Sequence, residues 1–226
     1  MRQSVILIDM HSGDDQPHPW LGIDLHVYER HMSDAQVGQL QRLHDITLEQ
    51  LAAYPSRAIG VLGIAGGNGL DLIDPQTDAV YGYDVNPGYL AACEARYRAG
   101  LGDRLHLIEA RIDRSLRIER VGLLIANLII EYVGVEEFIA FVAANARSIG
   151  VLSCVIQRND TSGFVSSTDY ASSFDGLASV SSDVAPETLA SAMAEARFEA
   201  LDHFEHPLPN GKTLVRQDFR PTQTAR

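Results

Sequence analysis

The sequence contains little cysteine and little positive charge. Cys93 and Cys154 are the only cysteines, and we expect both to be small apolar core residues rather than a disulfide or a metal-binding pair. The 18 Lys and Arg residues stand against 30 Asp and Glu residues, which gives a formal net charge of -12 and argues against a nucleic-acid partner. Arg111, Arg114 and Arg117 are spaced by three and could share a helix face, but acidic neighbours interrupt the run, so we expect a solvated surface there.

The sequence also lacks long hydrophobic runs and several catalytic signatures. No apolar stretch approaches the length of a membrane span, and residues 1–9 lack an apolar segment long enough for a signal peptide. We therefore expect a cytoplasmic protein with no membrane partner. Neither a G-x-S-x-G elbow nor a G-x-x-x-x-G-K-S/T phosphate loop occurs. The histidines form no metal-binding signature, so no metal is expected.

A glycine-rich turn between two apolar runs is what the sequence does contain. The run at 58–64 leads into the segment Ala65-Gly-Gly-Asn-Gly69, and a second run at 79–83 ends on Asp84. Glycines let the backbone turn sharply and approach a ligand where a Cβ atom would clash. An acid at the tip of the following strand can bind both hydroxyls of a ribose. This order predicts a nucleoside pocket in a parallel α/β sheet.

Apolar runs and turn signals alternate along the rest of the chain. We expect strands at about 58–65, 79–84, 104–110, 122–127 and 151–157, and helices at about 33–54, from 69, from 87, at 135–147 and at 186–196. Asn210-Gly211 is a strong turn signal, so the segments on either side of it should pair as an antiparallel hairpin. Strands that are almost continuously apolar indicate a sheet covered on both faces, which predicts a doubly wound α/β fold.

The glycine loop is closer to G-x-G-x-G than to the G-x-G-x-x-G of dinucleotide-binding folds, because Leu72 stands where the third glycine would be. Together with Asp84 and the C-terminal hairpin, it resembles the class I S-adenosylmethionine-dependent methyltransferases over about residues 57–220. The resemblance implies a mostly parallel seven-stranded, Rossmann-like sheet with a C-terminal antiparallel hairpin, and S-adenosylmethionine as the cofactor. The cofactor-binding residues that it implies are Ala65, Gly66, Gly67, Asn68, Gly69, Asp84, Val85 and Asn127.

Two positions depart from the pattern of that family. Gly63 stands where the family usually has an acid that contacts the amino group of the methionine part. Arg111 stands where it often has an acid that binds the adenine amino group, and Glu109 or Asp113 are the alternatives there. Whether these two missing acids abolish cofactor binding stays open at this point.

The segment from Ile125 to Val133 resembles the family's fourth motif, where the chain leaves the strand beside the methyl group. We expect Asn127 and Glu131 to be the catalytic residues, with Asn127 holding the substrate or the methionine part and Glu131 a candidate base. A solvent-facing helix position is an equal alternative for Glu131, and core or rim packing is the alternative for Tyr132. No Pro-Pro follows Asn127, so the signature for amino-group methylation of bases or glutamine is missing.

The resemblance therefore implies in-line methyl transfer to a small-molecule acceptor by one methyltransferase-like domain spanning residues 1–226. Its expected parts are an N-terminal extension and helix at 1–56, a cofactor-binding core at 57–157, a candidate lid loop at 158–185, and a C-terminal helix and hairpin at 186–220. The segment from Tyr28 to Met32 is a further candidate to close over the cofactor. A homodimer stays open as a form of assembly.

Three alternatives remain. The first is a nicotinamide-dependent oxidoreductase on a related sheet, against which the missing third glycine and the hairpin speak. The second is a non-catalytic protein that binds S-adenosylmethionine or a nucleotide, which the departures at Gly63 and Arg111 keep open. The third is a methyltransferase that acts on a protein or RNA rather than on a small molecule.

Overall fold

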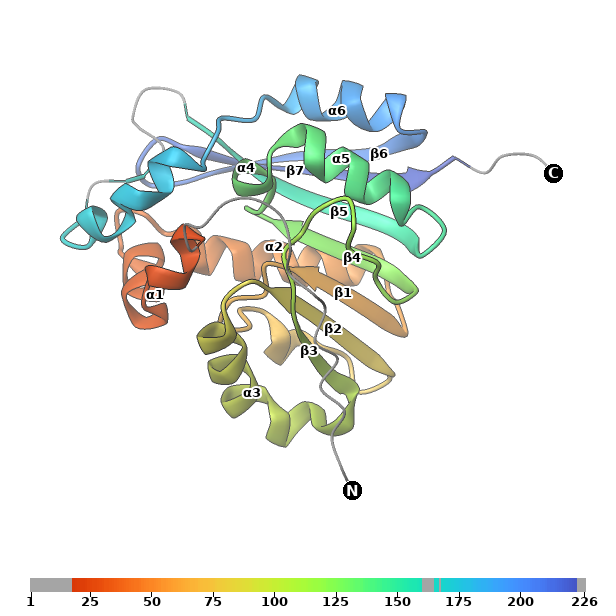
Figure 1. The fold of residues 1–226 in the computed structure, drawn as a ribbon, viewed down its shortest axis with the longest axis horizontal. Coiled ribbons are helices and arrows are strands. Elements are labelled where there is room, and N and C mark those ends of the chain that lie inside the picture. The colour runs from red at the N-terminus through yellow and green to blue at the C-terminus, as the bar shows by residue number, and fades with distance from the viewer. Residues whose placement is uncertain (1–17, 160–164, 167, 223–226) are drawn as a thin grey trace.

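The structure is a computed structural model and describes residues 18–159, 165–166 and 168–222. These residues form a seven-stranded sheet with the strand order β3-β2-β1-β4-β5-β7-β6 (Figure 1). The strands are β1 Ala58–Leu62, β2 Ala79–Asp84, β3 Leu105–Glu109, β4 Val121–Asn127, β5 Ile149–Arg158, β6 Phe198–Pro207 and β7 Thr213–Pro221. The first 17 residues of the predicted N-terminal extension lie outside the described part.

The direction of the strands confirms the predicted sheet. The strands β1 to β5 are parallel where they pair, whereas β7 runs antiparallel to both β5 and β6. Leu62 of β1 is level with Tyr83 of β2 and with Ala126 of β4. The residues that follow these three positions therefore meet at one edge of the sheet, where the strands have their carboxyl ends.

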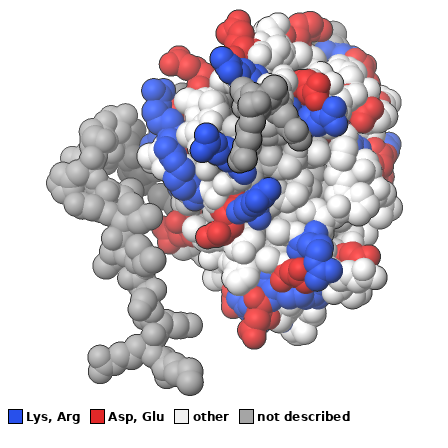
Figure 2. Space-filling model, turned by 90° about the vertical axis from the view of Figure 1, so that its right-hand side faces the viewer, with Lys and Arg blue, Asp and Glu red and all other residues white. Residues whose placement is uncertain are grey.

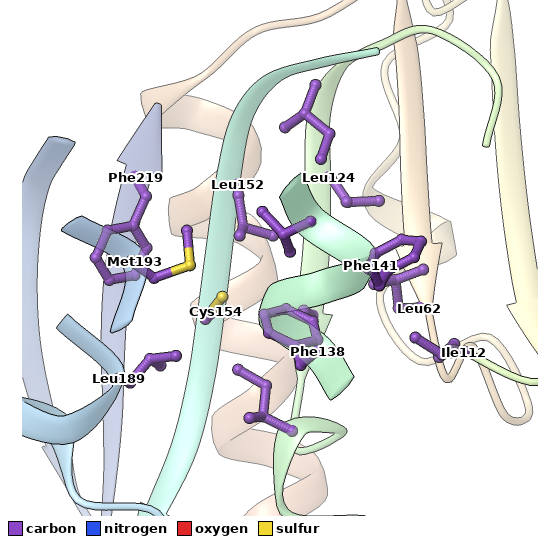
Figure 3. Packing of buried hydrophobic residues seen from close by; sticks show 14 of the residues in the cluster. Leu62, Ile112, Leu124, Phe138, Phe141, Leu152, Cys154, Leu189, Met193 and Phe219 are labelled. Carbon is purple, nitrogen blue, oxygen red and sulfur yellow. The ribbon is translucent and has the colours of Figure 1, made fainter. Parts of the chain in front are cut away.

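Helices cover both faces of the sheet, as expected for a doubly wound fold. The helices are α1 Leu25–Ser33, α2 Gln39–Ala53, α3 Pro87–Leu101, α4 Ile130–Val133, α5 Val135–Ala144 and α6 Pro186–Glu195. On one face, α5 and α6 bury Phe138, Phe141, Leu189 and Met193 against the sheet, and Figure 3 shows these side chains among Leu62, Leu124, Leu152, Cys154 and Phe219. Burying large apolar side chains in this way is the main force that holds such layers together.

The opposite face is covered by α2 and α3. Ile46 of α2 packs with Val155 and Leu214, and Leu90 and Cys93 of α3 join the cluster that contains Val80 and Leu105. Cys93 and Cys154 are both buried and free, which confirms the prediction of apolar core cysteines. Among the described residues, no helix has the length and apolar character needed to cross a membrane.

Two predicted helices differ from the structure. The helix predicted over 33–54 begins later, as α2 at Gln39, because Gly38 takes a left-handed conformation with a φ of 63° just before it, and α1 lies ahead of the predicted range. The helix predicted from residue 69 is only the 3-10 turn η2, Leu70–Leu72. Few residues separate Gly69 from β2, and Pro75 lies among them, so a regular helix cannot extend there.

The arginine run lies on the surface, as predicted. Arg111, Arg114 and Arg117 are exposed, and the segment that carries them is not helical. Arg114 forms an ion pair with Glu137 of α5, with NH2 2.6 Å from Oε2. Figure 2 shows one face of the molecule, on which basic and acidic side chains are interspersed. The loop after β5 contains the 3-10 helix η4, Ala171–Ser179.

Candidate functional site

The glycine loop leaves the carboxyl end of β1 and turns back on itself. Gly67 and Gly69 have φ angles of 86° and 89°, a conformation that side chains with a Cβ rarely adopt. A Cβ atom at Gly67 would lie 2.8 Å from Sγ of Cys93, and one at Gly69 would lie 2.7 Å from Cγ2 of Thr47. These two glycines are required by both conformation and space, so the loop backbone is held close to α2 and α3.

Gly63 shows why an acid is missing from this loop. Its φ is 66°, and a Cβ atom there would lie 2.9 Å from Cδ1 of Ile129. An aspartate or glutamate at this position would be strained by the left-handed backbone, and the side chain of Ile129 would have to shift to make room for it. Arg111, the second departure, is exposed.

Ala65 also takes a left-handed conformation, with a φ of 46°. We predict that Ala65→Gly raises the free energy of unfolding by about 1 kcal/mol, because glycine adopts this conformation without a steric penalty. Chemical denaturation checks this. The matched control is Ala58→Gly in β1, where the φ angle is ordinary and glycine should instead destabilise the protein. Equal effects at the two positions would contradict the account of the loop.

Asp84 joins the glycine loop to the end of β2. Its Oδ2 accepts a hydrogen bond from the backbone N–H of Ala65 at 2.9 Å, and its Oδ1 accepts one from Asn86 at 2.9 Å. Asn86 caps α3 by accepting from the N–H groups of Gly88 and Tyr89, so Asp84 is free of that role. Burial raises the pKa of Asp84, while the backbone hydrogen bonds oppose that shift. A carboxylate has about four acceptor positions, so Asp84 retains lone pairs for a ligand.

The other predicted cofactor residues lie along the same edge. Gly66 is buried, and its carbonyl oxygen accepts a hydrogen bond from Arg96 at 3.2 Å. Asn68 is exposed and donates to the carbonyl oxygen of Leu40 in α2, so its side chain ties the loop to that helix. Val85 is half-buried between Asp84 and Asn86.

The N-terminal segment packs over this edge. Glu29 of α1 forms a bidentate ion pair with Arg96 of α3, and Arg96 also donates to the carbonyl oxygen of Gly66. The side-chain amide of Asn86 donates to the carbonyl oxygen of Trp20 at 2.9 Å. The segment that contains Tyr28 therefore lies against the glycine loop, and its closing over the cofactor stays a prediction.

Four aromatic side chains meet where this segment packs. Trp20 makes edge contacts with Tyr28 and Tyr132, with ring centroids 5.6 and 4.9 Å apart, and Tyr28 stacks on Tyr89 at 6.2 Å. Nε1 of Trp20 and the hydroxyl of Tyr89 are buried and have no hydrogen-bond partner within the described residues. Buried polar atoms of this kind need an explanation, and a ligand that hydrogen-bonds to them is one. Trp20 and Tyr89 were not among the predicted site residues.

Asn127 ends β4, and its side chain is turned toward α2. Its Oδ1 accepts a hydrogen bond from Nε2 of Gln50 at 2.9 Å, and its Nδ2 donates to Oε1 of Gln50 at 3.2 Å. The next residue, Leu128, has a φ of 54°, and its N–H donates to the carbonyl oxygen of Val155. This strained turn redirects the chain from β4 into α4.

Glu131 is fully buried, so the solvent-facing alternative for this residue is wrong. Its Oε1 accepts a hydrogen bond from the backbone N–H of Gln157 at 2.7 Å, which places the carboxyl group at the end of β5. Its Oε2 has no hydrogen-bond partner among the residues that the structure describes. Burial raises the pKa of Glu131 to about 7. The two predicted catalytic residues are thus held by different partners, Asn127 by Gln50 and Glu131 by Gln157.

No family model and no curated protein matches this chain. Solved structures do match. Magnesium protoporphyrin IX methyltransferase (ChlM) from Synechocystis PCC 6803, with SAH bound, has a TM-score of 0.65 and 12% identity over 86% of this chain and 93% of that one. The N-methyltransferase NodS from Bradyrhizobium japonicum WM9, in complex with S-adenosyl-L-homocysteine, has a TM-score of 0.63 and 13% identity over 88% and 98%. The cyclase SpnF has a TM-score of 0.63 and 13% identity over 81% and 82%. The chain therefore has the class I methyltransferase fold.

Proposed function

We propose that this protein transfers a methyl group from S-adenosylmethionine to a small-molecule acceptor. The observation that carries the proposal is the hydrogen bond from the N–H of Ala65 to Asp84, because it brings the glycine loop and the acid together at the carboxyl edge. Ligands of open α/β sheets bind at this edge. Similar folds crystallised with S-adenosylmethionine or its demethylated product, such as ChlM and NodS, support the choice of cofactor.

The residues present fit this cofactor. The loop backbone at Gly67 and Gly69 is packed against Cys93 and Thr47, which fixes the conformation of the glycine loop beside Asp84. Asp84 has lone pairs for two ribose hydroxyls, and the unpartnered Trp20 Nε1 and Tyr89 hydroxyl suit the polar groups of a nucleoside. Gly63 carries no acid for the methionine amino group, and the neighbouring Asn127 is the candidate to contact that group instead.

When bound, S-adenosylmethionine supplies a methyl group on a sulfonium, which is already a good leaving group. The protein's own contribution is then mostly orientation and exclusion of water. Ala65 to Gly69, Asp84 and Val85 would hold the nucleoside part, and Asn127 would orient the reacting end. Glu131 would accept the acceptor's proton on Oε2, because its pKa of about 7 suits a general base near neutral pH.

The raised pKa of Glu131 has a consequence for stability. The folded protein keeps the proton on Glu131 up to about pH 7, whereas the unfolded chain loses it near the ordinary glutamate pKa of 4.5. The folded state therefore binds more protons between these values, and this contribution to stability is lost as the pH rises through that window. We predict that Glu131→Gln removes this loss, so the variant becomes more stable relative to wild type as the pH is raised from 4.5 to 8. Denaturation at several pH values measures the difference, and parallel curves for both proteins would contradict the burial of an ionisable group there.

Two rival functions make different predictions. A nicotinamide-dependent oxidoreductase is disfavoured because the antiparallel β7 and the loop spacing are not those of a dinucleotide-binding fold. Binding without methyl transfer is the alternative that the departures at Gly63 and Arg111 leave open. The similarity to the cyclase SpnF also illustrates that this fold is not restricted to methyl transfer.

Calorimetric titration of the wild-type protein with S-adenosylmethionine, S-adenosylhomocysteine and a nicotinamide dinucleotide tests the cofactor. We expect binding of the first two only. Incubation with methyl-labelled S-adenosylmethionine and fractionated small-molecule extracts then tests transfer, with a protein and RNA fraction as separate arms. Binding with no labelled product in any fraction would favour the non-catalytic alternative, and selective dinucleotide binding would overturn the proposal.

A further inference from the structure

A chain of buried polar side chains leads away from Asn127 on the face of the sheet that α2 covers. Gln50 of α2, Ser153 of β5 and Asp218 of β7 are each fully buried, and Arg216 of β7 is 2% exposed. Ser153 and Asp218 are paired directly in the β5–β7 register. None of these four residues belongs to the glycine loop, to Asp84 or to the surroundings of Glu131. Buried polar groups of this kind are retained only where their hydrogen bonds are satisfied.

The donor and acceptor of each hydrogen bond in this chain of side chains follow from the Asp218 carboxylate. The guanidinium of Arg216 donates to Asp218 from Nε at 3.0 Å and from NH2 at 2.5 Å, and Ser153 donates its hydroxyl to the same carboxylate. An ionised carboxylate can only accept hydrogen bonds, so the Ser153 proton must point toward Asp218. The Ser153 oxygen is then left as an acceptor, and Gln50 donates to it from Nε2 at 2.9 Å.

This order reaches Asn127 through Gln50. Since Nε2 of Gln50 faces Ser153, the two amides can pair in only one sense, in which Gln50 donates to Oδ1 of Asn127 and accepts from its Nδ2. If the Asn127 amide were turned over, its Nδ2 donor would face the Nε2 donor of Gln50, and its Oδ1 acceptor would face the Oε1 acceptor of Gln50. We infer that Gln50 is a positioning residue, which fixes the orientation of the Asn127 amide. The orientation of Gln50 is itself set through Ser153 by the buried Arg216–Asp218 ion pair.

The consequence concerns how Asn127 meets its ligand. Asn127 follows Ala126, which is level with Leu62, so it lies beside Gly63 at the carboxyl edge. With one lone pair of Oδ1 and one proton of Nδ2 bound to Gln50, one lone pair and one proton remain. This inference rests on the proposed function, under which these remaining groups contact the amino-acid part of S-adenosylmethionine. Holding the Asn127 amide in one orientation increases the affinity of the protein for the ligand, because no further ordering of that side chain is needed on binding.

Calorimetric titration with S-adenosylhomocysteine tests the inference on five variants of the full chain. They are Gln50→Met, Ser153→Ala, Asn127→Ala, the double variant Gln50→Met with Asn127→Ala, and Ile46→Val as a control. Ile46 is fully buried one turn earlier on α2, so its substitution loosens the same helix without touching the hydrogen bonds. Ser153→Ala removes a single oxygen atom and keeps the test available if Gln50→Met does not fold.

We expect Gln50→Met and Asn127→Ala each to weaken binding about tenfold, as for one misplaced hydrogen bond. Ser153→Ala should weaken it by a smaller but measurable factor, and Ile46→Val should not change it. The double variant should bind as Asn127→Ala does, because Gln50 acts only through Asn127. Wild-type affinity in both Gln50→Met and Ser153→Ala, or multiplied losses in the double variant, would overturn the inference while leaving the proposed function intact. Absence of S-adenosylhomocysteine binding in the wild type would contradict both this inference and the proposed function.

Discussion

Replacing Asp84 by Ala is expected to weaken the binding of S-adenosylmethionine by about 100-fold. A buried carboxylate that accepts hydrogen bonds from two ribose hydroxyls contributes roughly 1.5–3 kcal/mol per bond, and each 1.4 kcal/mol corresponds to a factor of ten. The same substitution leaves the N–H groups of Ala65 and Asn86 without their acceptor, so the loop that cradles the ligand is also loosened. Calorimetric titration of the purified variant measures the loss.

Two further variants make this result specific. Asp84→Asn keeps the size of the side chain and one carbonyl acceptor, so it should lose less affinity than Asp84→Ala. Asp78 precedes the same strand at its opposite end and forms an ion pair with Arg57. Asp78→Ala should therefore bind as the wild type does. If Asp84→Ala retained full affinity in a folded protein, the edge formed by the glycine loop and Asp84 would not be the cofactor site.

The Arg216–Asp218 ion pair gives the second large effect, on stability. Asp218→Ala is expected to lower the free energy of unfolding by about 3 kcal/mol or more, because it leaves the guanidinium of Arg216 buried without its main partner. Glu49 compensates little, since its Oε2 lies 3.7 Å from NH1 of Arg216 and its side chain is half exposed. The ring of Phe204 lies 5.1 Å from the guanidinium carbon and stabilises the charge only in part. Chemical denaturation measures the change.

A double substitution separates the lost charge pair from lost packing. Arg216→Met combined with Asp218→Leu replaces both charges by apolar groups of similar size, and this combination should recover most of the lost stability. Asp175→Ala is the surface control, since Asp175 lies on η4, away from this ion pair, and is exposed. It should change the stability by less than about 0.5 kcal/mol. A loss after Asp218→Ala no larger than that of the control would contradict a buried ion pair.

Much of the fold could be predicted because its signals are local. The glycine loop and Asp84 stand within about 20 residues of each other, and each follows a short apolar run of the length that is typical of a buried strand. The turn signal Asn210-Gly211 predicts the C-terminal hairpin. Helix boundaries were less predictable, because the start of α2 after Gly38 depends on the contact of Gly38 with Pro209, which is far away in the sequence.

The surroundings of Asn127 could not be predicted in the same way. Gln50, Ser153 and Asp218 come from three distant segments, and only the strand order brings them to Asn127. One signal was present, since Gln50 falls on the apolar stripe that contains Leu43 and Ile46, where a polar residue needs a buried partner. The sequence did not identify that partner. The burial of Glu131 likewise depends on Gln157 and on the segment around Ser182, whose N–H donates to the Glu131 carbonyl oxygen.

The most direct test of the central claim is to map S-adenosylhomocysteine onto the chain by backbone-amide NMR titration of the wild-type protein. We predict that the largest shifts fall on the amides from Gly63 to Gly69 and on Val85 and Asn86, with smaller ones at Asn127 and Leu128. The amides at the opposite edge, such as Asp78 and Gly122, should not move. Shifts confined to that opposite edge, or no shifts at saturating ligand, would contradict a cofactor site at the carboxyl ends of β1, β2 and β4.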